Sequence, residues 1–149
     1  MPTVDIIGDI HGYAEKLRRL LGRLGYRENG GVYADPERAA IFVGDLIDRG
    51  RAIGETLEIV SAMIRSGTGQ IVMGNHEFNA LAFHTPDGKG DYLRPHTDKN
   101  CSQHSPALEY FEKNPNAAKK ALTWFYSLPL WLDLGFACIG HSVAADALP

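Results

Sequence analysis

The sequence predicts an α/β fold whose core is built from parallel βαβ units. Short apolar runs alternate with segments of helical periodicity, and three of those runs end in Gly followed by Asp or Asn. The three junctions are Gly8-Asp9, Gly44-Asp45 and Gly74-Asn75. Because ligands of such sheets bind at the carboxyl ends of the strands, we expect the junctions to meet at one edge and to form the functional site there.

Strands and helices are predicted to alternate through the first half of the chain. Residues 3–7 form a β-branched apolar run, which predicts a buried strand. The following helix, over 14–24, carries four leucines on one face and ends before Gly25. Those leucines are Leu17, Leu20, Leu21 and Leu24. The remaining predicted elements are a short strand at 32–34, a strand at 39–43, a helix at about 53–65 and a strand at 70–73.

The second half of the chain has a weaker pattern. The segment 84–104 is polar and shows no clean period, which predicts a long loop or insertion, and such loops are often functional. The predicted elements beyond it are helices at 105–113 and at 115 to about 126, and strands at 130–134 and 136–139. We expect Trp131 in the core and Cys138 to act as a small buried apolar side chain.

Composition excludes several classes of protein. A length of 149 residues fits a single domain over 1–149. Fifteen lysines and arginines against eighteen aspartates and glutamates give a net charge of −3, which excludes a basic nucleic-acid coat. Neither a signal-peptide pattern nor a bilayer-length apolar run is present, so no membrane association is expected. The two cysteines, Cys101 and Cys138, form no Cys-x-x-Cys pair, which favours a reducing, cytoplasmic location.

The side chains at the junctions are typical metal ligands. Asp9 and His11 are two residues apart, so in an extended loop they point the same way and can ligate one divalent cation. Asp45 offers two oxygens and can bridge two cations. Asn75 adds a neutral carbonyl oxygen, and His141 adds a second imidazole. The pattern therefore indicates a site for divalent metal.

The neighbouring residues suit a phosphate group. Arg49 presents a planar donor fork that matches phosphate oxygens. His76, beside Asn75, is placed to protonate a leaving oxygen, and Asp48 can hold its other ring nitrogen. These residue types together suit a phosphate group and the protonation of an oxygen that leaves it.

Each signal also has a purely structural explanation. A single Gly-Asp after a strand is usually a turn, and a lone Arg49 would usually be a surface ion-pair partner. Glu77 is expected to be a charge at a helix N-terminus rather than a partner of the ligands. The histidines of the polar segment, His84, His96 and His104, are expected to be mostly solvated rather than to contact substrate. Three matching junctions nevertheless favour a functional site over three coincident turns.

The motifs GDxHG, GDxxDRG and GNHE resemble those of the calcineurin-like metallophosphoesterase superfamily, in its phosphoprotein-phosphatase-like branch. The segment 78–134, with its Leu-Pro-Leu-Trp-Leu-Asp-Leu run, is similar to bacterial proteins related to symmetrical bis(5′-nucleosyl)-tetraphosphatases. The resemblance implies the N-terminal half of a four-layer αββα sandwich. It also implies hydrolysis of phosphomonoesters or nucleotide polyphosphates by direct attack of a metal-bridging hydroxide.

By position, the resemblance implies two divalent metal ions. Asp9 and His11 would bind the first, Asp45 would bridge both, and Asn75 with His141 would bind the second. Manganese is the first expectation, with iron, zinc, cobalt and nickel as alternatives. The sequence leaves the metal open.

The resemblance also implies how phosphate is handled. Arg49, Asn75 and His76 would bind the phosphate, and His76 with Asp48 and Arg49 would form the catalytic group. The substrate is left open among a phosphorylated small molecule, a dinucleotide polyphosphate and a phosphoprotein.

After His141 the pattern changes, because Ser142-Val143-Ala144 stands where the family has a small residue and then a further half-domain. The resemblance thus covers about half of a family domain, which predicts a weaker second metal site. It also predicts an uncovered sheet face that drives self-association. The alternative function is a truncated fragment that binds metal and phosphate without efficient turnover.

Overall fold

A parallel three-stranded sheet forms the centre of the computed structural model, which describes residues 3–141. The strand order is β1 (Thr3–Ile7), β4 (Arg38–Phe42) and β5 (Gly69–Ile71). Ile7 is in register with Phe42, and Phe42 with Ile71, so the three strands end side by side. The expected α/β class is therefore confirmed, and Ser142–Ala144, where the sequence leaves the family pattern, lie outside the described residues.

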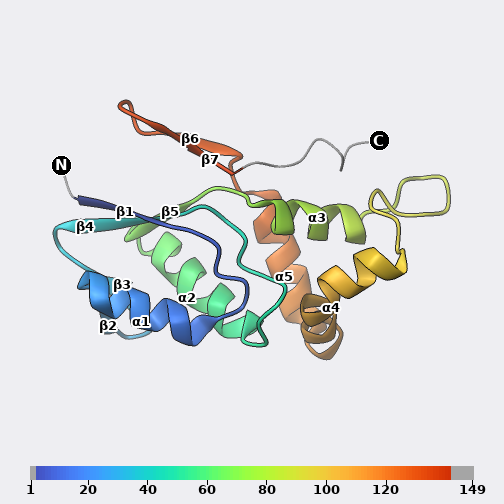
Figure 1. Cartoon of the computed structure of the whole chain (residues 1–149), viewed down its shortest axis with the longest axis horizontal. Helices are drawn as coiled ribbons and strands as arrows, with labels where there is room; N and C mark the ends of the chain where they lie inside the picture. Colours follow the sequence, from blue (N-terminus) through green and yellow to red (C-terminus); the bar gives the residue numbers. More distant parts are fainter. Residues whose placement is uncertain (1–2, 142–149) are drawn as a thin grey trace.

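Helices α1 (Ala14–Leu24) and α2 (Ile53–Arg65) cover one face of this sheet (Figure 1). Both match the predicted bounds. Leu17 and Leu21 are buried as expected, whereas Leu20 is 40% exposed. The buried stripe of α1 begins at Ala14 instead, because the helix turns its small residue toward the sheet. Gly25 ends the helix with a φ of 104°, a conformation that favours glycine.

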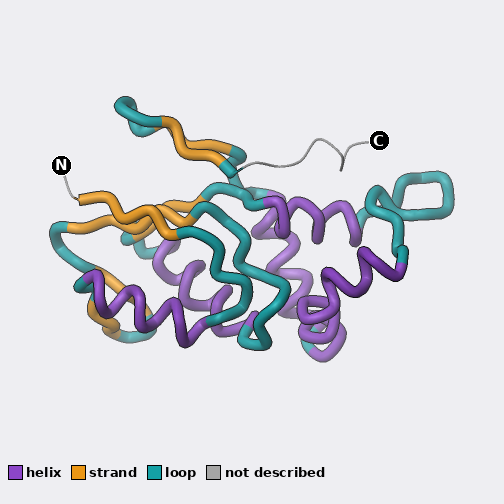
Figure 2. The backbone as a smooth tube through the Cα atoms, in the orientation of Figure 1, coloured by secondary structure: helices purple, strands orange, loops and turns teal. Residues whose placement is uncertain are grey.

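Two antiparallel hairpins complete the strands. The first pairs β2 (Arg27–Asn29), which the sequence did not predict, with β3 (Val32–Ala34), which it did. The second pairs β6 (Trp131–Asp133) with β7 (Cys138–Gly140), each shorter than expected. In Figure 1 and Figure 2 the second hairpin lies on the opposite side of the sheet from α1 and α2.

The second hairpin corrects two expectations about the core. Trp131 is 62% exposed and Cys138 is also exposed, so neither is a core residue. Ile6 of β1 and Phe136 of the hairpin turn are exposed to a similar degree. None of these side chains belongs to the main core, which lies on the other face of the sheet. Self-association through this face stays a prediction.

Three helices form the remainder: α3 (Asn75–His84), α4 (Asp98–Lys113) and α5 (Pro115–Tyr126). Helix α5 matches the prediction, but the expected 84–104 loop does not, because α4 begins at Asp98. Thr97 caps the helix by accepting a hydrogen bond from the Asn100 N–H at 3.2 Å. No described helix has both the length and the apolar character needed to cross a bilayer.

Pro106 inside α4 explains why the sequence suggested a later start. Proline supplies no N–H, so the Ser102 carbonyl loses its helical partner. The Ser105 hydroxyl donates to that carbonyl at 3.0 Å and replaces the missing bond. The helix therefore continues through a residue that normally marks a boundary.

Candidate active site

The three predicted junctions meet at the carboxyl ends of the parallel strands. The His11 and Ile10 N–H groups both donate to the Asp45 carbonyl, at 2.8 and 3.0 Å, which ties the first junction to the second. The second and third junctions touch at Gly44 and Gly74, where a Cβ on either residue would overlap the backbone of the other junction. Glycine at both positions is what allows this approach.

Glu77 fastens the second junction to the third. Its side chain is fully buried, and it accepts hydrogen bonds from the backbone N–H groups of Asp45 (2.7 Å), Leu46 (2.8 Å) and Gly74 (3.0 Å). Burial raises the pKa of this carboxyl, although the three N–H donors oppose the shift. Glu77 thus sits directly behind Asp45 and is more than a charge at a helix end.

The backbone of the site is strained. Four described residues other than glycine have a positive φ: His11 (49°), Asp45 (54°), Asp48 (65°) and Arg49 (76°). All four are residues that the motifs single out. Such conformations cost free energy and persist where the surrounding structure enforces them, which is common at functional sites.

The imidazole rings of His11 and His141 each point the Nε2 atom toward Asp45. His11 Nδ1 donates to the Ile47 carbonyl at 2.9 Å, and His141 Nδ1 donates to the Val43 carbonyl at 2.8 Å. Because a carbonyl can only accept, the Nε2 atom of each neutral ring carries a lone pair. His11 Nε2 lies 4.0 Å and His141 Nε2 lies 3.5 Å from Asp45 Oδ2. His11 Nε2 is buried without a hydrogen-bond partner.

Asn75 shows the same excess of acceptors. Its Oδ1 lies 3.0 Å from His141 Nε2, so two acceptor atoms face each other beside the Asp45 carboxylate. Turning the amide by half a turn would place its NH₂ group 3.0 Å from both His141 Nε2 and Asp45 Oδ2. The oxygen-inward orientation is satisfied by a cation, or by a proton on His141 Nε2, and the nitrogen-inward orientation suits the cation-free protein with a neutral His141.

These residues fall into two groups that could hold metal ions. His11, Asp45 and His76 form one, Asp9, Asp45 and His141 the other, and the ligand atoms within each lie within 4.8 Å of one another. Asp45 belongs to both groups, as a bridging ligand would. The sequence predicts Asp9 as the partner of His11, whereas His76 is the residue grouped with His11 here. His11 Nε2 nevertheless lies 3.6 Å from Asp9 Oδ2. The donor set, oxygen with imidazole nitrogen, fits divalent transition metals.

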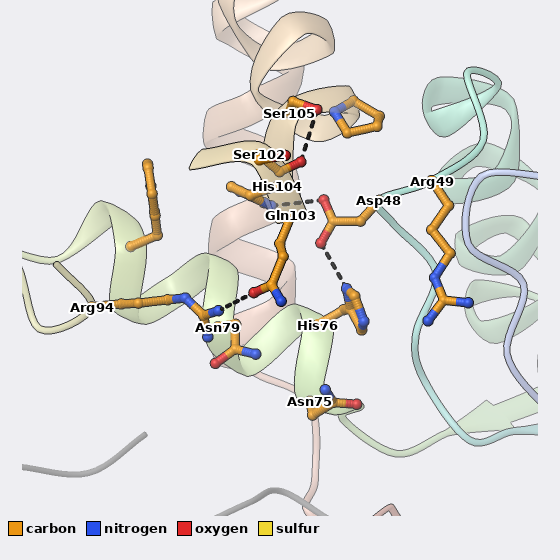
Figure 3. Close-up of a pocket in the computed structure, with 12 residues that line it drawn as sticks. Asp48, Arg49, Asn75, His76, Asn79, Arg94, Ser102, Gln103, His104 and Ser105 are labelled. Carbon is orange, nitrogen blue, oxygen red and sulfur yellow. Dashed lines mark hydrogen bonds and ion pairs between the residues drawn. The ribbon is translucent and has the colours of Figure 1, made fainter. Parts of the chain in front are cut away.

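Asp48 lies between two histidines (Figure 3). One oxygen contacts His76 Nδ1 and the other contacts His104 Nδ1, each at 2.7 Å. Burial would raise the pKa of Asp48, but the bonds from His104 and His76 outweigh it and lower the pKa. Burial would likewise lower the pKa of His76, yet the Asp48 bond and the Asp45 charge raise it. Asp48 is thereby fixed as a carboxylate that orients His76.

His104 corrects the expectation that the histidines of the polar segment are mostly solvated. It is 5% exposed and reaches Asp48 from α4, across 56 positions of sequence. Its Nε2 is buried without a hydrogen-bond partner. No spacing in the sequence indicates this contact. Only the Thr97 cap signal, which extends α4 toward the site, could have suggested it.

Comparison with known proteins places the chain. Residues 2–145 match the calcineurin-like phosphoesterase family. The chain belongs to this family. Its curated relatives include the asymmetrical bis(5′-nucleosyl)-tetraphosphatase PrpE of Halalkalibacterium halodurans, 45% identical over 73 residues, and that of Bacillus subtilis, 40% identical over 73 residues. Each alignment covers 48% of this chain and 30% of the relative, so the chain spans under a third of those proteins.

Solved structures agree on the fold. A Saccharomyces cerevisiae serine/threonine phosphatase with similarity to human PP5 has a TM-score of 0.55 at 20% identity, covering 87% of this chain and 34% of the other. A cold-active protein-tyrosine phosphatase of Shewanella also has a TM-score of 0.55, at 22% identity, covering 89% and 41%. The curated relatives carry the asymmetrical name, whereas the segment 78–134 had pointed to proteins related to the symmetrical enzymes.

Two pockets of this calcineurin-like phosphoesterase fold meet at Arg49. A pocket of about 410 Å³ lies on the side of His76 and Asp48, and another of about 410 Å³ lies on the side of Asp9 and His11. Arg49 lines both, is exposed, and makes no ion pair with any described residue. Its guanidinium group is therefore available to a ligand that lies over the two groups of metal-binding residues that share Asp45.

Proposed function

We propose that this chain carries the catalytic centre of a metal-dependent phosphoesterase that acts on phosphomonoesters or nucleotide polyphosphates. The observation that carries the proposal is the convergence of potential ligand atoms on Asp45, with His141 Nε2 at 3.5 Å and His11 Nε2 at 4.0 Å from its Oδ2 and with both Nδ1 atoms bonded to backbone carbonyls. Such an arrangement is unfavourable alone and favourable around cations. The names of the curated relatives favour a dinucleotide polyphosphate as substrate.

The residues that would hold two divalent cations are Asp9, His11, Asp45, Asn75 and His141, with manganese the first metal to test. When bound, the cations would lower the pKa of the attacking water and neutralise charge on the phosphoryl oxygens. The Val43 and Ile47 carbonyls fix the tautomers of His141 and His11, as outer hydrogen bonds do at metal centres.

The chain's own side chains would position the substrate and move a proton. Arg49 would grip the phosphoryl oxygens with its planar fork. His76, held by Asp48 through Nδ1, keeps Nε2 free to protonate the leaving oxygen. His104 would act as a positioning residue, because it holds the second Asp48 oxygen and so fixes the plane of the carboxylate.

The test is Mn²⁺-dependent hydrolysis of p-nitrophenyl phosphate by the chain and by Asp45→Asn. We expect the substitution to lower kcat/KM by about 1,000-fold or more, since Lewis-acid stabilisation is worth several kcal/mol. Asp5→Asn, the same change far from the site, is the matched control and should retain activity. Mn²⁺ binding without hydrolysis by the wild-type chain would overturn the proposal and favour a binding role without turnover.

A further inference from the structure

The pocket beside His76 is larger than one phosphate group needs. Its near wall carries Asp48 and His76, and its far wall is built from α4 and the 85–97 loop, with Gln103 and Arg94. In the view of Figure 3, Arg94 enters from the side opposite Arg49, with Asp48 and His76 between the two arginines. The far wall thus adds a cation that the motifs do not include.

Arg94 lacks a counter-ion. It is half-buried, and it donates only to neutral amide oxygens, Asn100 Oδ1 at 3.2 Å and Gln103 Oε1 at 3.1 Å. Within residues 3–141 it has no carboxylate at ion-pair distance, although other buried charges of the site are paired. Burial lowers the pKa of its guanidinium, and only the more distant Asp48 charge opposes that shift. A partly desolvated cation without an anion is a receptor for one.

The loop that carries Arg94 is held in place. The Arg94 N–H donates to the Ala82 carbonyl at 3.0 Å. Next to it, His96 is stacked between Phe83 and Tyr92, with ring centroids 3.8 and 4.1 Å apart, and its Nε2 bonds to the Phe83 carbonyl at 2.8 Å. The arginine is therefore presented on a fixed support, which reduces the entropy lost when it binds a ligand.

We propose that Arg94 binds a second phosphate group of the substrate, on the leaving-group side of His76. The inference rests on the proposed function and narrows it to substrates with a P–O–P bridge. His76 lines the same pocket as Arg94, so a leaving oxygen beside His76 opens toward the arginine. Asn79 and Gln103, also in the lining, would supply neutral hydrogen bonds around the second phosphate.

The chemistry explains why a cation helps there. Water adds across the bridge: its oxygen bonds to one phosphorus, the bridging oxygen leaves with the other phosphate, and one proton is released. Negative charge builds on the leaving phosphate as that bond breaks. His76 would give its proton to the bridging oxygen, and Arg94 would stabilise the charge on the phosphate that carries this oxygen. A nitrophenyl leaving group carries no phosphate for Arg94 to bind.

The experiment compares kcat/KM for inorganic tripolyphosphate and for p-nitrophenyl phosphate, both with Mn²⁺. We expect the wild-type chain to prefer tripolyphosphate, and Arg94→Gln to lower the ratio of the two values by roughly 10- to 100-fold, the worth of a charge-assisted hydrogen bond. Arg27→Gln, the same change on the exposed β2 strand, should leave the ratio unaltered. A purely structural Arg94 would lower both values together, and an unchanged ratio would overturn the inference.

A binding measurement separates this inference from the proposed function. Titration calorimetry with tripolyphosphate and with inorganic phosphate needs no turnover and can be run in EDTA. We expect Arg94→Gln to weaken tripolyphosphate binding by roughly 10-fold relative to phosphate, and Arg94→Lys to restore part of it. If the wild-type chain shows no hydrolysis but Arg94→Gln still loses affinity for tripolyphosphate selectively, the phosphoesterase proposal is refuted and the anion site stands. If the wild-type chain hydrolyses its substrates but Arg94→Gln binds tripolyphosphate as tightly as the wild type does, the anion site is refuted and the phosphoesterase stands.

Discussion

The two ends of the central sheet use the same kinds of side chain with opposite results. Toward the amino ends, Asp5 in the middle of β1 accepts two bonds from Arg38, the first residue of β4, at 2.6 and 2.8 Å, and one from the Tyr26 hydroxyl at 3.1 Å. At the carboxyl ends, Asp45 Oδ2 faces the Nε2 atoms of His11 and His141. Donors match acceptors at the first end, and acceptors face acceptors at the second.

The difference separates stabilising groups from ligand-binding groups. The Arg38 bonds lower the pKa of Asp5 and keep it charged, so this carboxylate is complete within the chain. Asp45 is 3% exposed and still lacks a donor for Oδ2 among the described residues unless the Asn75 amide turns. A buried polar group is normally satisfied, so an unsatisfied cluster indicates a missing partner.

The largest effect on stability is expected at Glu77. This residue tests whether a buried carboxylate stabilises the fold through its hydrogen-bond donors rather than through the end of the sheet at which it lies. Glu77 lies at the carboxyl end yet is matched by three N–H donors. Glu77→Ala should lower the free energy of unfolding by about 3 kcal/mol or more, since each buried donor left unpaired costs about 1–3 kcal/mol. Urea unfolding in EDTA measures this. Glu112→Ala, on the exposed side of α4, is the control, and equal losses in both variants would contradict the assignment.

The next effect concerns His104, which links the polar segment to the site. His104→Phe keeps an aromatic ring at this position but removes the bond to Asp48, and we expect kcat for an alkyl phosphate to fall roughly 10-fold. The loss with p-nitrophenyl phosphate should be smaller, because that leaving group needs less protonation. His104→Asn places an amide N–H near the position of Nδ1 and should restore part of the alkyl rate. Equal losses on both substrates, without rescue, would make His104 a packing residue.

Much of the fold could be predicted because its signals are local. Helices α1, α2 and α5 carry apolar residues at helical spacing and stop at residues such as Gly25 or start at Pro115. The true start of α4 could not be predicted because Pro106 suggests a helix boundary. The Ser105 hydroxyl compensates for the proline by a hydrogen bond to the Ser102 carbonyl, which no sequence pattern indicates. Trp131 was misplaced because an apolar strand residue shows no sign of which face is covered.

The site follows the same rule. The junctions share a motif and a sheet edge, so their meeting could be predicted from Asp9, Asp45 and Asn75. The contact between Asp48 and His104 spans 56 positions with no periodic signal. The positive φ of Arg49 and its neighbours also leaves no trace in the sequence, because strain depends on what the whole fold enforces.

The smallest changes in stability should distinguish the two ends of the sheet most clearly, because the same substitution, Asp to Asn, is made at each end. In EDTA, Asp5→Asn removes a charge that Arg38 and Tyr26 satisfy, so the urea midpoint should fall. Asp45→Asn supplies an N–H to the facing imidazole nitrogens and keeps the Oδ1 that accepts from the His76 N–H at 3.0 Å. It should therefore raise the free energy of unfolding by about 1 kcal/mol, the net worth of one hydrogen bond.

Adding Mn²⁺ should reverse the order of these two variants. A ligand at 100 times its Kd stabilises the folded state by about 2.7 kcal/mol, so wild type and Asp5→Asn should both gain. Asp45→Asn should gain far less, because it has lost the carboxylate common to both ligand groups. If both Asn variants lose stability in EDTA and gain equally with Mn²⁺, the acceptors at the carboxyl end are ordinary structural groups and the contrast between the ends is wrong.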